Sequence, residues 1–137
     1  MATPITVKTI IKASPEKAWD VFFNPSYITQ WCFASPDWHC PKAEGDLRVG
    51  GTFSSRMEAK DGSFGFDFGG TYTEVTIHST AAYILGDERT VKISFHAIGD
   101  KTEVTETFDP ESENPVEMQQ AGWQAILDNY KKVCDAA

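Results

Sequence analysis

The sequence lacks any run of about 18 apolar residues, the length that a helix needs to cross a membrane. Its N-terminus, MATPITVKTI, also lacks the basic region and the apolar block that mark a secretory signal peptide. We therefore expect a cytoplasmic protein that has no membrane partner.

Basic residues are few. Lys and Arg together number 12, against 20 Asp and Glu residues, and the net charge is -8. Phosphate backbones attract basic surfaces, so this balance argues against a nucleic-acid partner and against anionic membranes. The charge favours solubility without indicating a partner.

Cysteine is scarce and odd in number, with Cys32, Cys40 and Cys134. An odd count without a signal peptide argues against a disulfide framework. The stretch CFASPDWHC contains no C-x-x-C pair, so we expect no metal site. The sequence also has no G-x-S-x-G, H-E-x-x-H or P-loop pattern. It therefore indicates no catalytic residue and no cofactor, and leaves open whether the protein is an enzyme.

The first third of the chain predicts a strand and two short helices. Residues 5–13, ITVKTIIKA, are rich in β-branched residues and predict a strand. Residues 14–24, SPEKAWDVFFN, begin with a capping serine and a proline, as helices do. Residues 26–32 predict a second short helix. Residues 33–44 contain two prolines and have no clear period, so they predict a loop.

The middle of the chain predicts antiparallel strands separated by turns. Gly50-Gly51 and Asp61-Gly62 are typical hairpin signals. The double glycine Gly69-Gly70, inside a long strand, predicts a bulge or a sharp bend. The predicted strands are TFSSRMEAK, SFGFDFGGTYTEVTI, STAAYILG, RTVKISFHAI and KTEVTETFD.

The last predicted element is a long helix over residues 115–134, with apolar residues recurring at intervals of three and four. An antiparallel sheet with one face to bury and a helix with one apolar stripe predict an α+β fold. In it, a curved sheet wraps around the C-terminal helix. No linker or repeat divides the chain, so residues 1–137 are expected to form a single domain.

Four stretches carry a resemblance to a known family. They are ASPEKAWDVFFNPSYITQW, DLRVGGTFSSRMEAKDG, GGTYTEV and ENPVEMQQAGWQAILDNYKK, and they span nearly the whole chain. In content and order they resemble the SRPBCC superfamily, also called START-like or Bet v 1-like. Within it they are similar to the Hsp90-ATPase-activator-homologue (AHSA1-like) branch.

The resemblance implies a helix-grip fold, in which about seven antiparallel strands grip the long C-terminal helix and leave a cavity between them. It also implies several functions, because members include ligand carriers, hormone sensors, cyclases and co-chaperones. A fold of this kind does not determine the function.

Aromatic residues are the main candidates for the wall of such a cavity. Phe64, Phe66 and Phe68 alternate along one strand, so their rings are expected on one face, toward the helix. There they form either a packed core or the lining of a ligand pocket. The other aromatic candidates are Trp31 and Trp38, beside the segment expected to cover the mouth of the cavity, and Trp123, on the inward stripe of the helix.

One carboxyl group is expected inside. Alternation in KTEVTETFD turns Val104 and Phe108 inward, and Glu106 lies between them. A buried carboxylate without a partner is costly, so Glu106 is expected to be protonated or paired. It is then a candidate general acid or base, or an anchor for a ligand hydroxyl or amine. Alternatively, Glu106 lies in water at the strand end or pairs with an arginine, with Arg48 and Arg56 as candidates.

Three further residues complete the candidate ligand site. Phe95 belongs to the inward set of its strand, and Met57 is expected inward while Arg56 is outward. The orientation of Tyr72 stays open, because it follows the double glycine. The first hypothesis is non-catalytic binding of a small apolar molecule. The alternatives are a co-chaperone role with an Hsp90-type partner and a cyclase- or hydrolase-like enzyme.

Overall fold

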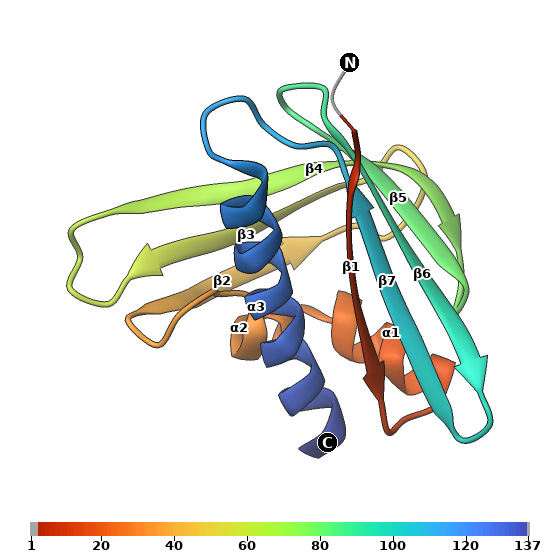
Figure 1. Ribbon diagram of the computed structural model, residues 1–137. Coiled ribbons are helices and arrows are strands. Elements are labelled where there is room, and N and C mark those ends of the chain that lie inside the picture. Colours follow the sequence, from red (N-terminus) through yellow and green to blue (C-terminus); the bar gives the residue numbers. More distant parts are fainter. Residues whose placement is uncertain (1–2, 137) are drawn as a thin grey trace.

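The computed structural model describes residues 3–136 and contains one seven-stranded antiparallel sheet and three helices (Figure 1). The strand order in the sheet is β1-β7-β6-β5-β4-β3-β2. The predicted helix-grip fold is confirmed. The elements are β1 (Ile5–Ile11), α1 (Pro15–Phe23), α2 (Pro25–Trp31), β2 (Trp38–Gly45), β3 (Thr52–Ala59), β4 (Gly65–Thr76), β5 (Thr80–Leu85), β6 (Thr90–Ile98), β7 (Lys101–Phe108) and α3 (Val116–Ala136).

Local capping sets the two short helices. The Ser14 side chain accepts a hydrogen bond from the Lys17 backbone N–H at 3.3 Å, at the start of α1. Asn24 ends α1, and its side chain then caps α2 by accepting a hydrogen bond from Ser26 N–H at 3.1 Å. One residue therefore closes one helix and opens the next.

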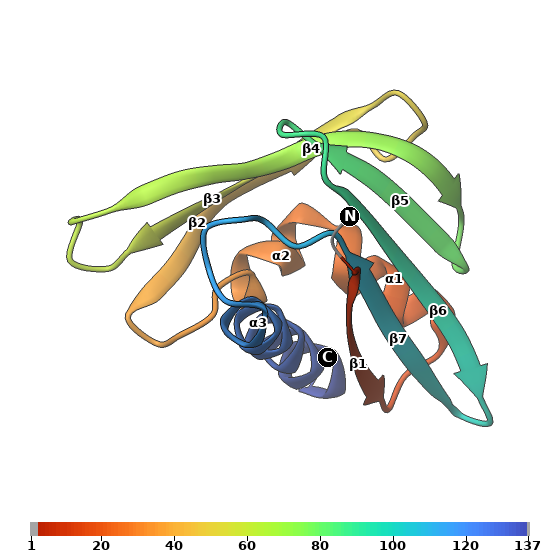
Figure 2. The same ribbon diagram turned by 45° about the horizontal axis from the view of Figure 1, so that its top comes forward.

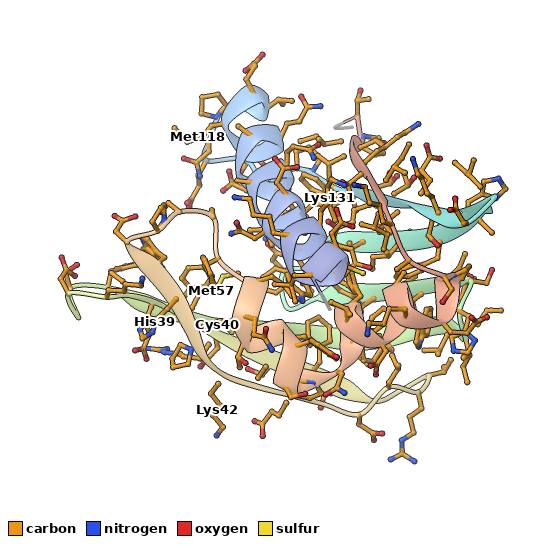
Figure 3. The ribbon with its side chains drawn as sticks, turned by 90° about the horizontal axis from the view of Figure 1, so that it is seen from below. His39, Cys40, Lys42, Met57, Met118 and Lys131 are labelled. Atoms are coloured by element: carbon orange, nitrogen blue, oxygen red, sulfur yellow. The ribbon has the colours of Figure 1, made fainter. Side chains whose placement is uncertain are left out.

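The prediction of a loop over residues 33–44 is wrong for its second half, because residues 38–44 belong to strand β2. This strand lies at the edge of the sheet, and its register with β3 shifts between His39 and Lys42, on either side of Pro41. Proline has no N–H to donate, so a strand tolerates it only at an edge or a bulge. In Figure 3, Lys42 points away from the molecule, and its side chain is exposed.

Strand β4 is bent (Figure 2), and the double glycine lies inside it without a shift in its register with β3, while the register shift falls further on, between Tyr72 and Glu74. A β-carbon at Gly69 would lie 2.3 Å from the Phe53 carbonyl oxygen, and one at Gly70 would lie 2.4 Å from the Ile84 carbonyl oxygen. Only glycine lets the neighbouring strands approach this closely. The bend carries β4 from one wing of the sheet to the other (Figure 2).

Helix α3 lies on the concave side of the sheet, between the β2-β3 wing and the wing that holds β5, β6, β7 and β1 (Figures 1 and 2). Its C-terminal half is packed tightly: Leu127, Tyr130 and Cys134 are buried, and the Tyr130 hydroxyl donates a hydrogen bond to the Ala18 carbonyl oxygen at 2.7 Å. Helices α1 and α2 thus fill one half of the grip. Within residues 3–136, no helix combines the length and the apolar composition that crossing a membrane requires.

Candidate ligand-binding site

The half of the grip that faces the N-terminal part of α3 is not filled. A cavity of about 280 Å³ lies there, between the sheet and the three helices. Its walls are mostly aromatic and aliphatic. The lining residues are Phe22, Phe23, Ile28, Trp31, Cys32, Phe53, Ser55, Met57, Phe66, Phe68, Tyr72, Tyr83, Arg89, Glu106, Trp123 and Ile126.

A second cavity, of about 320 Å³, adjoins this first cavity. The two share part of their lining, including Met57, Phe66 and Trp123. The second cavity continues toward the N-terminal end of α3, where Figure 3 labels Met118. The shared side chains therefore stand between an inner chamber and an outer one.

Most of the predicted site residues lie together around these chambers. Those that line the first cavity are Trp31, Met57, Phe66, Phe68, Tyr72, Glu106 and Trp123. Trp38 lines the second cavity. Phe64 and Phe95 line neither.

Phe64 differs from the prediction because strand alternation decides the face of a residue but not what covers it. It precedes β4, and its side chain is 63% exposed. This end of the β3-β4 hairpin extends beyond α3 (Figure 1). The Phe64 ring packs only at the rim, with its centroid 5.9 Å from that of Trp38. Phe66, two residues further along β4, is still 42% exposed, and it is the first of the three phenylalanines whose ring lines a cavity.

Phe95 faces inward as predicted but belongs to the solid core. Its ring centroid lies 5.3 Å from that of Trp19 and 5.7 Å from that of Phe22, both on α1. Helix α1 therefore covers Phe95 and separates it from the cavity.

The structure turns Tyr72 inward, where it is 6% exposed. The register between β4 and β5 shifts between Tyr72 and Glu74. After this shift Val75 packs against the core while Ile77 is 67% exposed. The bulge thus changes which positions of the strand face inward, from Tyr72 before the shift to Val75 after it.

Glu106 lies inside the grip as alternation predicts, with an exposed fraction of 6% between two fully buried neighbours, Val104 and Phe108. Within the described residues its carboxyl group has no hydrogen-bond or ion-pair partner. Loss of hydration on burial raises the pKa of Glu106 from its ordinary 4.5 to about 8. The group therefore carries a proton near neutral pH.

The two candidate arginines for Glu106 lie elsewhere. Arg56 Nε is 2.8 Å from a carboxylate oxygen of Glu58, and Arg48 Nε is 2.7 Å from one of Asp46. Arg56 projects from the outer face of β3, whereas its neighbour Met57 is buried against the cavity, as predicted. Pairing with either arginine is therefore not what neutralises Glu106.

Sequence reasoning missed several lining residues. Tyr83 could have been predicted from the sequence, because alternation in STAAYILG turns Ala81, Tyr83 and Leu85 inward. All three are buried. Arg89 gave no such signal, because it comes from the turn before β6. Its Nε is 2.6 Å from a carboxylate oxygen of Asp87, so its charge is already paired at the margin of the cavity.

Three polar groups at the cavity, those of Glu106, Tyr72 and Tyr83, are neutral near pH 7. Loss of hydration raises the pKa of Tyr72 to about 12 and raises the pKa of Tyr83 well above its ordinary value. Glu106, as a protonated acid, and the two phenols are then hydrogen-bond donors. Among residues 3–136 no cluster of His, Cys, Asp and Glu side chains is suited to hold a metal ion.

The fold and the cavity define this chain as a helix-grip protein with an internal chamber. Residues 12–135 match the family described as Activator of Hsp90 ATPase homolog 1-like protein. The chain belongs to this family. No curated protein matches it.

Solved structures of other proteins share this fold. The AHSA1-like protein from Aeromonas hydrophila is 41% identical, with a TM-score of 0.92 over 98% of this chain and 93% of its own. Chr148 from Cytophaga hutchinsonii is 48% identical, with a TM-score of 0.83 over 96% of this chain and 92% of its own. Protein CV1439 from Chromobacterium violaceum shares the fold at 21% identity, with a TM-score of 0.84 over 96% of each chain.

Proposed function

We propose that this protein binds a small, mostly apolar molecule in the first cavity, without catalysis. The observation that carries the proposal is the unfilled, aromatic-lined chamber between the sheet and α3. Protein interiors are close-packed, and voids larger than a water molecule are few. Small-ligand pockets typically begin at about 300 Å³ and have mostly apolar walls with a few polar groups. The first cavity, with its neighbour, meets this description.

The walls are held in place before any ligand arrives. The Trp123 indole stacks on Phe108 with ring centroids 3.9 Å apart, and Phe68 meets the same indole at 5.9 Å. Phe53 and Tyr83 pack edge to face at 4.7 Å, and both rings lie within 6.3 Å of Phe68. A preformed pocket of this kind needs little ordering on binding, and this favours affinity for a rigid apolar molecule.

A titration with N-phenyl-1-naphthylamine, an uncharged fluorescent probe for apolar sites, tests the proposal. We expect probe fluorescence to rise and backbone NMR shifts to cluster around Met57, Phe68 and Trp123. The Ser55→Leu variant fills the cavity from the buried face of β3 and should abolish binding. Ser54→Leu, on the outer face, is the matched control and should bind normally. An absence of binding, or equal binding by a folded Ser55→Leu variant, would contradict the proposal.

A protein-contact role of the Hsp90-activator kind is a second candidate. Its support is the family description together with an exposed apolar rim beside the second cavity, where Phe64 is 63% and Met118 61% exposed. Measurement of the Hsp90 ATPase rate with the wild type and with Phe64→Ser tests it. An unchanged ATPase rate in the presence of the wild-type protein would count against this role.

A further inference from the structure

We infer that the molecule held in the first cavity carries an uncharged oxygen that accepts hydrogen bonds, such as the carbonyl of a ketone or an ester, at the end that lies against Glu106. This inference rests on the proposed function and adds the chemistry of the ligand. It follows from three polar side chains on the inner face of the sheet.

These side chains come from three strands. Tyr72 on β4 and Tyr83 on β5 are direct cross-strand partners, and their ring centroids lie 6.2 Å apart. Glu106 lies on β7, beyond β6, and all three residues line the same cavity. The cross-strand partners of Glu106 itself are Val7 and Ile93, which are apolar and buried. The neighbouring strands therefore leave the carboxyl group without a polar partner.

The hydrogen bonds of the structure indicate where the polar groups of Glu106, Tyr72 and Tyr83 point. Within residues 3–136, neither the Glu106 carboxyl group nor the hydroxyl groups of Tyr72 and Tyr83 make a hydrogen bond. The same residues contain no fully enclosed side-chain oxygen or nitrogen that lacks a partner. The oxygens of the three groups are therefore open to the space of the cavity. A bound molecule that leaves them unmatched would incur the desolvation cost of buried polar groups.

The protonation states favour a ligand oxygen that accepts hydrogen bonds over a cationic group. Burial keeps all three groups neutral near pH 7, so each can donate a hydrogen. A bound carbonyl oxygen beside Glu106 accepts the hydrogen of its carboxyl group without any change of charge, and the phenols of Tyr72 and Tyr83 are donors for further oxygens of the ligand. An ammonium group would instead require that Glu106 ionise in an apolar chamber, at the cost of desolvating both charges.

No other titratable group that faces Glu106 changes this conclusion. The Tyr130 hydroxyl on α3 already donates to the Ala18 carbonyl oxygen, and Arg89 is paired with Asp87. The nearby Cys40 thiol and burial raise the pKa of Cys32, so this thiol stays neutral. The titratable and charged groups around Glu106 are Tyr72 on β4, Tyr83 on β5, Cys32 at the end of α2, Tyr130 on α3 and Arg89 in the turn before β6.

Three naphthalenes of nearly equal shape test the inference by displacement of N-phenyl-1-naphthylamine. They are 2-acetylnaphthalene, 2-isopropylnaphthalene and 1-(2-naphthyl)ethylamine, which carry a carbonyl, a methyl and an ammonium group at the same place. At a pH of about 6 we expect the ketone to bind about tenfold more tightly than the hydrocarbon, because it engages donors that the hydrocarbon leaves unmatched. This preference should decline as the pH rises through about 8, where Glu106 loses its proton.

Variants separate the role of the carboxyl group from the shape of the cavity. Glu106→Gln keeps an N–H donor, so it should keep the preference for the ketone and lose the pH dependence. Glu106→Leu has no donor, and it should bind the ketone and the hydrocarbon with affinities within about twofold. Tyr83→Phe should reduce the preference without removing its dependence on pH.

Three other results of the binding experiments would overturn either the inference or the proposed function. Equal binding of ketone and hydrocarbon by the wild type would overturn the inference and leave the proposed function standing. Tightest binding of the amine would show an ionised Glu106 that selects cations, and would also overturn it. If neither the fluorescent probe nor any of the three naphthalenes binds, the proposed function fails and the inference fails with it.

Discussion

Replacing Glu106 by glutamine should make the protein more stable, and the gain should grow as the pH rises. In the folded state burial raises the pKa of Glu106 to about 8, against 4.5 for the ordinary side chain. Below pH 4.5 both the folded and the unfolded chain hold this proton. Between the two values only the folded chain holds it, so stability falls as the pH rises. Above a pH of about 8 both states have lost this proton, so the stability falls no further.

The size of the effect follows from the same two values. Each pH unit in this window costs about 1.4 kcal/mol, so burying Glu106 costs about 5 kcal/mol in total by pH 8. Glutamine has nearly the same shape and cannot ionise. The stability difference between Glu106→Gln and the wild type should therefore rise by about 1.4 kcal/mol per pH unit from about pH 5 to about pH 8.

Urea denaturation of both proteins across this pH range measures the difference, and the other titrating groups cancel in it. The same substitution at Glu103, on the outer face of β7 beside His96, controls for the loss of one negative charge from an acidic protein. A difference that stays flat with pH, or one that turns in favour of the wild type at high pH, would refute an unpartnered Glu106.

Three other substitutions test the packing around the cavity, each by urea denaturation. Phe66→Ala should cost only about 1–2 kcal/mol because this ring is 42% exposed at the cavity, whereas Phe108→Ala, at 1% exposed, should cost about 3–5 kcal/mol; equal losses would mean that Phe66 is solid core. Gly69→Ala should cost about 1–3 kcal/mol through its clash with the neighbouring strand, while Gly86→Ala, which has open space around it, should be close to neutral. Tyr130→Phe removes the phenol's hydrogen bond to the buried Ala18 carbonyl oxygen, which keeps its bond within α1, and should cost about 0.5–1.5 kcal/mol; an unchanged stability would show that water replaces the phenol.

The comparison of sequence and structure separates local signals from contacts between distant segments. Ser14 begins α1 as predicted, because a cap acts within one turn of the chain. Alternation also places Glu106 and Met57 on the inner face correctly, because strand side chains keep a period of two. Strand β2 was missed, because an edge strand with a proline and a register shift has no regular period.

The amino-acid sequence by itself determined the family, the order of the elements apart from β2, and the inward face of the strands apart from the second half of β4. Only the tertiary structure decided what covers that face. Phe64, Phe66 and Phe95 are all expected inward by alternation, yet the Phe64 ring is exposed, the Phe66 ring lies at the margin of a cavity and the Phe95 ring is buried under α1. The reason is that the alternation of side chains is a property of a single strand. Burial of a side chain and its hydrogen-bond partners depend on which other helices and strands pack against that strand. The unpartnered state of Glu106 is of the same kind, since it depends on every element that surrounds the cavity.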